Sequence, residues 1–328
     1  MLLPGDHPAA IVQAAQHLRA GELVAFPTET VYGLGADASS DAAVAKIFAA
    51  KGRPADHPLI VHLASAAQVA NYASAVPAFA QRLMDALWPG PLTVILPRKP
   101  GVAAAAAGGQ GSIGLRCPAH PVALAFLAAC LDVGVKGVAG PSANRFGRVS
   151  PTTAAHVVSE FGGDLMVLDG GPCAVGIESS IVDCTRAQPV LLRPGVLTHA
   201  QLEAACGQRV LSADELTLAA PRASGTLESH YAPNANVRLM DAKAIQTALE
   251  VLGADAAHIA VYARSIVRIR SERVLFRRMP DDALATAQQL FAVLRDFDAQ
   301  GVKLIWIENP PQTPEWDGVR DRLGRAAA

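Results

Sequence analysis

Regular alternation of short apolar runs with helical segments is the feature that most constrains this sequence. Apolar runs typical of buried strands cover residues 22–26, 58–62, 92–96, 135–139, 165–168, 180–182 and 190–192. Before the first run, Ile11, Ala14 and Leu18 recur at the spacing of one helix face, as Val44 and Ile47 do between the first two runs. Strands that alternate with helices and are separated by Gly/Pro turns predict an α/β domain.

The alternation stops once and then restarts, which predicts a second domain. Residues 209–236 have little periodicity and are predicted to form a linker. After the linker, strands are predicted at 237–240, 259–263, 274–276 and 302–307, and helices at 242–252, 283–300 and from residue 315. Roughly 90 residues of this pattern suit a small Rossmann-like domain. We therefore predict three parts: an N-terminal domain (1–208), the linker (209–236) and a C-terminal domain (237–328).

The composition argues against several classes of protein. Hydrophobic residues make up 51% of the 328 residues, so a large core can form and disorder is not expected. Lysine and arginine number 28 against 29 acidic residues, so the chain as a whole has no electrostatic attraction to nucleic acid or to an anionic membrane. Anions must therefore be bound by local clusters of basic side chains.

Cysteine content and the first residues of the chain predict where the protein works. The five cysteines include no C-x-x-C pair, which argues for a reducing compartment and against a disulfide framework or a zinc site. The first ten residues lack the pattern of a signal peptide, and no apolar run reaches the ~18 residues that span a bilayer. We expect a cytoplasmic protein without a metal site of its own and without membrane contact.

Basic side chains concentrate at turns that follow predicted strands or helices. Lys51 and Arg53, beside Gly52 and Pro54, form a stiff basic corner that suits the oxygens of a polyphosphate. The alternative for this corner is a solvated helix end, where a lysine complements the helix dipole. Arg116 ends a short predicted strand and could pair with the carboxylate of a substrate. The alternative for Arg116 is an ordinary arginine exposed to solvent at the end of a strand.

Polar turns supply the remaining candidate groups. The loop after residues 138–139 is crowded with hydroxyls and an amide, so it can bind phosphate through side chains and backbone N–H groups. An ordinary Asx or Ser turn is the alternative. Residues 109–114 spell G-x-G-x-x-G, but no strand precedes them and no helix follows, so a dinucleotide fingerprint is rejected.

These turns occur as an ordered series of motifs. The series reads Pro-Thr-Glu-Thr-Val-Tyr-Gly-Leu (27–34), Lys-Gly-Arg-Pro (51–54), Pro-Leu-Ile-Val-His (58–62), Pro-Gly-Pro-Leu-Thr (89–93), Pro-Ser-Ala-Asn (141–144), Glu-Ser (178–179) and Leu-Arg-Pro-Gly (192–195). Over residues 10–208 it resembles the YrdC-like threonylcarbamoyl-AMP synthases, and the rest of the chain resembles the long, two-domain form of that family. The resemblance implies an α/β fold with a YrdC-like twisted-sheet N-terminal domain and a small Rossmann-like C-terminal domain.

The same resemblance implies a function. Enzymes of this family are nucleotidyltransferases that condense L-threonine, bicarbonate and ATP to threonylcarbamoyl-AMP and pyrophosphate. The product serves tRNA threonylcarbamoyladenosine modification, so a downstream tRNA threonylcarbamoyl transferase complex is the expected partner. Mg²⁺ is expected to bridge the phosphates of ATP.

Site residues follow from the resemblance by position. Lys51 and Arg53 are expected to be catalytic, and with Ser142 and Asn144 they match the family's signature tetrad. Residues expected to hold L-threonine are Thr30, His62, Arg116, Gly140 and Ser179. Residues expected to hold ATP are Arg53, His57, Ser112, Ser142, Asn144, Ser150, Arg193 and Tyr231. His57 stands where the family carries Asn, and Tyr231 of the linker is expected to close over the site as a lid.

Two other functions stay open at this point. A double-stranded RNA or tRNA-binding module without turnover is the first, because relatives of the fold have been regarded as binding RNA. The neutral charge and the 5% of aromatic residues argue against it. The second is carbamoyl-adenylate formation, as in hydrogenase-maturation relatives, but those carry zinc-finger modules and this chain lacks the cysteine pairs.

Overall fold

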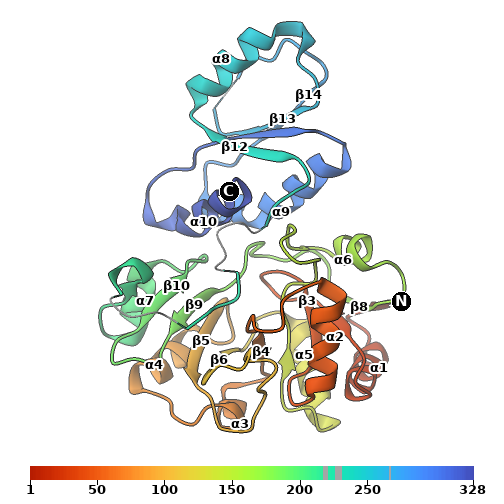
Figure 1. Cartoon of the computed structure of the whole chain (residues 1–328), viewed down its shortest axis with the longest axis vertical. Coiled ribbons are helices and arrows are strands. Elements are labelled where there is room, and N and C mark those ends of the chain that lie inside the picture. The colour runs from red at the N-terminus through yellow and green to blue at the C-terminus, as the bar shows by residue number, and fades with distance from the viewer. Residues whose placement is uncertain (217–220, 226–230, 266) are drawn as a thin grey trace.

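The computed structural model describes residues 1–216, 221–225, 231–265 and 267–328. Figure 1 shows two domains stacked along the long axis, with the C-terminal domain on top of the N-terminal domain. The predicted linker is described only in part, because its residues 217–220 and 226–230 lie outside the described residues.

Among the described residues, the N-terminal domain is built on one mixed sheet of 11 strands. Its order is β1 (Leu2–Pro4), β8 (Met166–Asp169), β2 (Val24–Phe26), β3 (Gly33–Asp37), β7 (Val138–Ala139), β4 (Ile60–His62), β6 (Ser112–Arg116), β5 (Leu92–Pro97), β9 (Ser180–Asp183), β10 (Val190–Arg193) and β11 (Leu211–Ser212). Strands β4 and β6 run parallel, and their register places His62 opposite Arg116. Strand β7 runs antiparallel to β4 and to β3, so several loops converge near the middle of the sheet.

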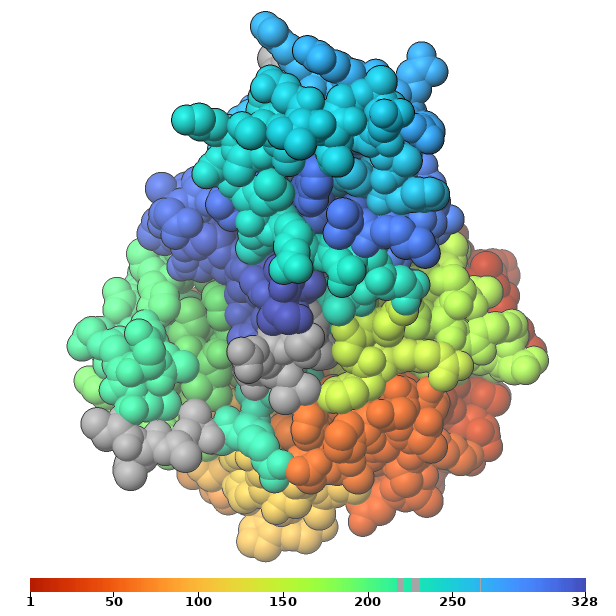
Figure 2. Space-filling model, turned by 45° about the horizontal axis from the view of Figure 1, so that its top comes forward, coloured from red at the N-terminus to blue at the C-terminus, as the bar shows by residue number. Residues whose placement is uncertain are grey.

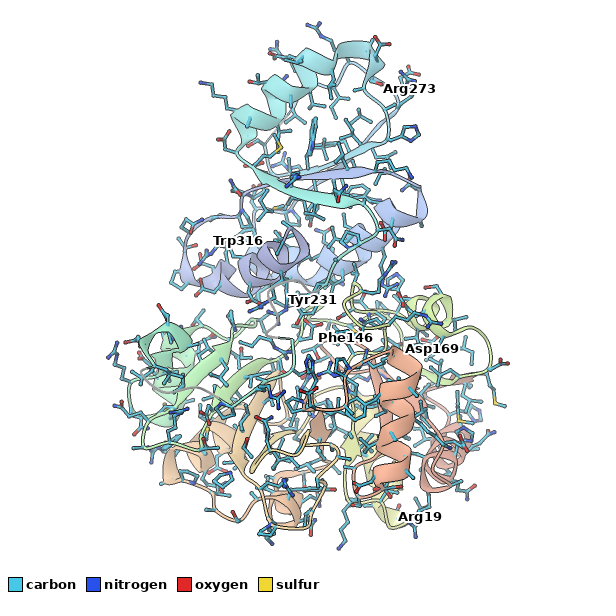
Figure 3. All side chains as sticks on the ribbon, viewed as in Figure 1. Arg19, Phe146, Asp169, Tyr231, Arg273 and Trp316 are labelled. Carbon is cyan, nitrogen blue, oxygen red and sulfur yellow. The ribbon has the colours of Figure 1, made fainter. Side chains whose placement is uncertain are left out.

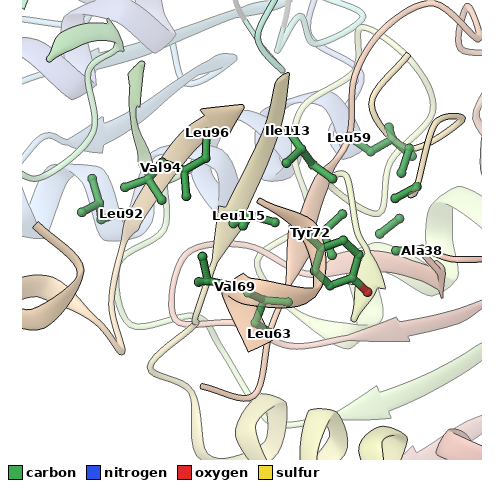
Figure 4. Packing of buried hydrophobic residues seen from close by; sticks show 14 of the residues in the cluster. Ala38, Leu59, Leu63, Val69, Tyr72, Leu92, Val94, Leu96, Ile113 and Leu115 are labelled. Atoms are coloured by element: carbon green, nitrogen blue, oxygen red, sulfur yellow. The ribbon is translucent and has the colours of Figure 1, made fainter. Parts of the chain in front are cut away.

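Helices cover this sheet and enclose its main core. They are α1 (Pro8–Arg19), α2 (Asp41–Lys51), α3 (Val69–Tyr72), α4 (Ala78–Leu87), α5 (Pro121–Asp132), α6 (Ala154–Phe161) and α7 (His199–Cys206), with short 3₁₀ turns at Ala66–Gln68 and Ala213–Glu215. Figure 4 shows part of the core, where Leu92, Val94 and Leu96 of β5 lie beside Ile113 and Leu115 of β6. The first five residues of β5 are all buried, as are Ile113, Leu115 and Arg116 of β6, which explains why apolar runs in the sequence locate the sheet.

The C-terminal domain has a parallel sheet in the order β12 (Asn236–Met240), β15 (Leu304–Glu308), β13 (Ile259–Ala263) and β14 (Val274–Arg278). Helices α9 (Ala283–Ala299) and α10 (Asp317–Ala326) lie between this sheet and the N-terminal domain, and α8 (Ala242–Leu252) lies on the far face (Figure 1). Two 3₁₀ turns, Gly253–Asp255 and Pro314–Trp316, complete the domain. The parallel sheet with helices on both faces confirms the predicted Rossmann-like class.

Sequence patterns predict most of these elements, but β3 is not among the predicted strands. Two glycines, Gly33 and Gly35, disfavour a strand by propensity. The structure shows why they are there: a Cβ on Gly35 would lie 2.9 Å from Val138 and 3.0 Å from the Val24 carbonyl oxygen. Neighbouring strands approach β3 so closely that a side chain does not fit at this position. Elsewhere the ends shift slightly, with β2 beginning at Val24 and β15 covering 304–308.

A second hydrophobic cluster crosses between the domains. It joins Val31, Val149 and Ile177 of the N-terminal domain to residues of α9 and α10 such as Phe291 and Leu323. Figure 2 shows the C-terminal segment seated directly on the N-terminal domain. In the described parts of the chain, no helix combines the length and the apolar character needed to cross a bilayer.

Candidate active site

A cavity of about 470 Å³, counting its open mouth, lies where the loops of the N-terminal domain converge under the C-terminal domain. Eight of the predicted site residues line it: Arg53, His62, Arg116, Gly140, Ser142, Ser179, Arg193 and Tyr231. They come from segments far apart in the sequence, and three of them are arginines that are almost fully buried. Arginine is seldom buried without a partner, so three of them around one cavity indicate a site for anionic groups.

Arg116 lies at one end of the cavity, on the last residue of β6. Its Nη1 donates a hydrogen bond of 2.8 Å to the Thr30 hydroxyl, and its Nη2 lies 2.6 Å from Oε1 of Glu29. Thr30 is fully buried and does not itself line the cavity; it lies behind Arg116 and orients its guanidinium. An arginine held this way can accept the carboxylate of an amino acid in bidentate fashion.

His62 lies beside Arg116 because β4 and β6 are parallel and in register. Burial and the nearby charge of Arg116 lower the pKa of His62 to about 3, so its imidazole is neutral at physiological pH. Gly140 leaves room for this ring, since a Cβ there would lie 3.0 Å from His62 Nδ1. The Nδ1 atom is buried and has no hydrogen-bond partner among the described residues, so it is available to a ligand.

Arg53 and Arg193 form a second group in the cavity, because both donate hydrogen bonds to Ser224. Arg53 donates 3.0 Å to the Pro58 carbonyl and lies 5.7 Å from the ring centre of Phe146, which Figure 3 labels below Tyr231. Burial lowers the pKa of Arg53 to about 10, and its Nε atom has no hydrogen-bond partner within the described ranges. Arg193 donates to the Ser179 carbonyl oxygen at 2.9 Å from Nη2.

Lys51 lies just behind the lining and holds the 142–144 loop. Ser40 caps the start of helix α2 with a side chain that accepts from the Ala43 N–H, and Gly52 caps its end in the left-handed conformation. Lys51 therefore sits in the last turn, and its Nζ donates to the carbonyl oxygen of Ser142 at 2.5 Å and to that of Asn144. Burial and the charge of Arg53 lower the pKa of Lys51 well below its ordinary value.

Of the remaining predicted residues, two are buried behind the cavity wall and two lie outside this cavity. Asn144 is buried behind the lining, where its amide donates to the Arg148 carbonyl at 2.9 Å. Ser150 is also buried, and its hydroxyl donates to Glu178 Oε1. Ser112 lines a neighbouring cavity of about 300 Å³, which shares Ile60 with the first. His57 lines neither cavity and packs edge-on against Phe146, with ring centroids 5.6 Å apart.

Sequence reasoning missed two carboxylates and an arginine. Glu178 lines the cavity, and Glu29 touches Arg116 from behind. Both stand inside quoted motifs, each next to a predicted threonine-site residue, and that adjacency was the available signal. Arg322 of α10 has no such signal, because nothing in its local sequence relates it to the N-terminal domain.

The described residues do not offer a protein-held metal site. No group of three or more histidine, cysteine or acidic side chains among them could hold a metal ion. The cavity's carboxylate Glu178 is already bound by Arg322, as Glu29 is by Arg116. A carboxylate paired with an arginine in this way is a poor ligand for a divalent cation.

Comparisons with known proteins agree over the whole chain. A family model described as "Telomere recombination" matches residues 16–195, and one described as "Threonylcarbamoyl-AMP synthase, C-terminal domain" matches residues 197–328. The chain is 36% identical over 323 residues to the threonylcarbamoyl-AMP synthase of Pyrococcus abyssi, covering 96% of this chain and 93% of that protein. It is 37% identical over 334 residues to the enzyme of the same name from Bacillus subtilis, with coverage of 97% and 92%.

A solved structure gives the same relationship in three dimensions. The crystal structure of Pyrococcus abyssi Sua5 complexed with L-threonine matches with a TM-score of 0.87 and 36% sequence identity. The match covers 98% of this chain and 95% of that one. Both domains and their relative placement are therefore shared with that structure.

Proposed function

Because the chain belongs to the threonylcarbamoyl-AMP synthase family and matches it over both domains, we propose that the 470 Å³ cavity binds L-threonine at its Arg116 end and ATP at its Arg53 and Arg193 end. The protein is a nucleotidyltransferase that makes threonylcarbamoyl-AMP. The observation that carries the assignment of the two ends is the set of three buried arginines around one cavity.

L-Threonine fits the Arg116 end by charge and by hydrogen bonding. The guanidinium of Arg116 pairs with the amino acid carboxylate, while neutral His62 accepts or donates one hydrogen bond without adding charge. Ser179, whose hydroxyl lies 2.8 Å from that of Thr93, also lines the cavity and can offer a hydrogen bond. Gly140 keeps space for the ligand beside His62.

ATP fits the other end, where Arg53 and Arg193 face the cavity. Guanidinium groups bind phosphate oxygens in bidentate fashion, and burial strengthens the attraction because little water screens it. The neighbouring cavity, with Ser112 and the apolar side chains of Ile60 and Ile95, continues from this end and suits the uncharged part of the nucleotide.

The reaction then needs positioning and charge neutralisation. The threonine amine captures bicarbonate as a carbamate with loss of water, and a carbamate oxygen attacks the α-phosphorus of ATP. The bond to the β-phosphate oxygen breaks, and pyrophosphate leaves with its charge. Arg53 and Arg193 stabilise the charge that develops on the phosphates. No serine or cysteine nucleophile is required in this scheme.

Lys51 contributes by holding the loop that carries Ser142. Its ammonium binds the carbonyl oxygens of Ser142 and Asn144 in that loop and adds positive charge behind the phosphate end. Removal of the ammonium would release the loop and lower the positive potential together. Lys51 therefore acts on the reaction from just behind the cavity wall.

We infer that Tyr231 closes over the site as a lid. Tyr231, labelled in Figure 3, is 1% exposed, lines the cavity and packs on Phe291 with ring centroids 5.4 Å apart. Closure by Tyr231 would exclude water from the mixed anhydride that the reaction forms. An unchanged release of free intermediate in Tyr231→Ala would contradict this role.

Mg²⁺ is expected from the family, but the described residues do not supply ligands for it. The ion prefers to keep several waters and to bind phosphate oxygens, so ATP itself can carry it into the site. The downstream partner we propose is a tRNA threonylcarbamoyl transferase complex, and the cytoplasm is the proposed location.

The test is a synthesis assay with purified protein, ATP, L-threonine, labelled bicarbonate and Mg²⁺. Pyrophosphate release that depends on both threonine and bicarbonate, with a labelled adenylate in chromatography, is the expected result. Lys51→Ala should abolish it. If ATP stays intact while the protein binds tRNA in a salt-dependent manner, the RNA-binding alternative replaces the proposed chemistry.

A further inference from the structure

We propose that Arg322, on helix α10 of the C-terminal domain, is a positioning residue for the ATP end of the cavity. The proposal rests on the assignment of ATP to the Arg53 and Arg193 end. It gives the C-terminal domain a defined task, which is to fix the shape of a site built from the other domain.

Arg322 reaches across the domain boundary and is fully buried there. Its Nε donates 2.8 Å to Glu178 Oε2, and its Nη2 donates 3.0 Å to the Glu178 carbonyl oxygen. Its Nη1 donates 2.8 Å to the Pro194 carbonyl oxygen and 2.6 Å to Asp321 Oδ2. One guanidinium thus ties together two separate loops of the N-terminal domain.

These two loops carry the ATP end of the cavity. Glu178 lines the cavity and precedes the Ser179 carbonyl group that accepts the 2.9 Å hydrogen bond from Arg193, while Pro194 directly follows Arg193. The other carboxylate oxygen of Glu178 accepts the hydrogen bond from the Ser150 hydroxyl. Fixing Glu178 and Pro194 therefore also fixes Ser150 and the backbone next to Arg193.

Arg322 also contacts the proposed lid. Its guanidinium carbon lies 5.3 Å from the ring centre of Tyr231, within the range of a cation–π interaction. The Tyr231 ring therefore lines the cavity and also contacts Arg322 and Phe291 of the C-terminal domain. The lid position and the two loops share one supporting side chain.

The electrostatics agree with a permanently charged pair. Burial acts to raise the pKa of Glu178, but the charges of Arg322 and Arg193 outweigh it and hold the pKa below its ordinary value. Burial acts to lower the pKa of Arg322, but Tyr231 and Glu178 outweigh it and raise the pKa. A buried ion pair is an inefficient way to gain stability, so a role in specifying geometry is a better reason for it.

Helix α9 supports the same region independently. Arg295 donates to the carbonyl oxygens of Val149 and Ser150, the latter at 3.4 Å, and to Glu160 at 2.8 Å. Ser150 is therefore held through its side chain by way of Glu178 and through its backbone by Arg295. Both helices of the C-terminal domain that face the N-terminal domain thus act on the ATP end.

The experiment compares ATP and L-threonine affinities by calorimetry in Arg322→Gln, Arg322→Lys and the wild type. Arg322→Gln should raise the Kd for ATP roughly tenfold or more, because it leaves the Glu178 charge unpaired and frees the two loops. The Kd for L-threonine should stay within about twofold, because the Arg116 end has separate supports. Arg322→Lys keeps the charge and should recover part of the ATP affinity.

The matched control is Arg320→Gln on the same helix, since the Arg320 side chain bonds Pro311, Thr313 and Asp317 within the C-terminal domain. This variant should bind both ligands as the wild type does. Wild-type ATP affinity in Arg322→Gln, or an equal loss of both ligands, would overturn the proposal. A wild type that binds neither ligand would instead overturn the proposed function.

Folding of the variants is checked by thermal melting. Should Arg322→Gln not fold, the double variant Glu178→Gln/Arg322→Gln takes its place, because it leaves no unpaired buried charge. The double variant should show the same selective loss of ATP affinity. Retained ATP affinity in that variant would contradict the proposal equally well.

Discussion

The Nη2 atom of Arg116 lies 2.6 Å from Oε1 of Glu29, and both side chains are buried. Glu29 Oε2 has no hydrogen-bond partner among the described residues. Glu29 does not line the cavity, so it holds the guanidinium of Arg116 from behind. The guanidinium that faces the cavity is thereby oriented to pair with the carboxylate of an amino acid.

Arg116→Gln should therefore weaken L-threonine binding selectively. Loss of a charge-assisted pair predicts a rise in Kd of roughly 10- to 100-fold, with the Kd for ATP little changed. Calorimetric titration of each ligand measures both. Arg82→Gln is the control, because Arg82 bonds the Cys206 carbonyl and lines neither cavity. Unchanged threonine affinity in Arg116→Gln would exclude Arg116 as the carboxylate site.

His62 predicts a pH dependence of stability. Its pKa falls from an ordinary value of 6.5 to about 3 in the folded protein, chiefly through burial. Below pH 6.5 the unfolded chain takes up a proton that the folded chain does not, so lowering the pH towards 3 destabilises the fold. The slope contributed by His62 approaches about 1.4 kcal/mol per pH unit.

Urea unfolding of the wild type and of His62→Gln at about pH 7 and about pH 5 checks this slope. The free energy of unfolding should fall less steeply with acid in His62→Gln. Some slope should remain, because burial also lowers the pKa of His156, to about 4. Parallel curves for the two proteins would show that His62 is not the buried neutral group described here.

Gly225→Ala should weaken ATP binding, while its loss of stability should not exceed that of a matched control variant. A Cβ there would lie 2.3 Å from the Tyr231 hydroxyl and 2.7 Å from Arg193 Nη1, so these two side chains must move. The Kd for ATP should rise roughly tenfold. Gly301→Ala is the matched control, because Gly301 has nearly the same φ, +73° against +74°, and nothing lies within 4 Å of its Cβ position.

Both variants should lose a similar ~1–2 kcal/mol from the left-handed backbone, as thermal melting would show. Only Gly225→Ala should lose ATP affinity. Equal ATP affinity in the two variants would place Gly225 outside the ATP end.

Gly318→Ala should weaken the packing of helix α10 against the N-terminal domain. Its Cβ would lie 2.3 Å from the backbone oxygen of Gly195, which cannot move aside like a side chain. We expect a loss of roughly 1–3 kcal/mol in the free energy of unfolding and weaker ATP binding, since Gly195 follows Arg193 and Pro194. Thermal melting and ATP titration measure the two effects.

Gly324→Ala, on the same helix, is the control. Nothing lies within 4 Å of its Cβ position, and alanine is the better helix former by up to ~1 kcal/mol. This variant should be as stable as the wild type or more so, with unchanged ATP affinity. A Gly318→Ala protein that behaves the same way would show that α10 does not press on this loop.

The sequence could predict the elements and the membership of the site because both depend on local patterns. Apolar periodicity locates β4, β5 and α9, and polar turns at the ends of strands and helices bring in Arg53, His62 and Arg116. Strand β3 was not predicted, because its glycines disfavour a strand by local propensity. The reason for a glycine at position 35 is the close approach of Val24 and Val138 on neighbouring strands. Local propensity is overridden there by tertiary contact.

The sequence alone therefore determined the α/β class, the two-domain layout and a set of polar turns that resembles one enzyme family. Tertiary structure decided which residues face the cavity and which stand behind it, as with Lys51 and Ser150, because strand register and loop approach set those directions. It alone revealed the pair of Glu178 and Arg322, which are 144 positions apart. Contacts of that length depend on how two domains dock, and no local pattern of residues encodes the docking geometry.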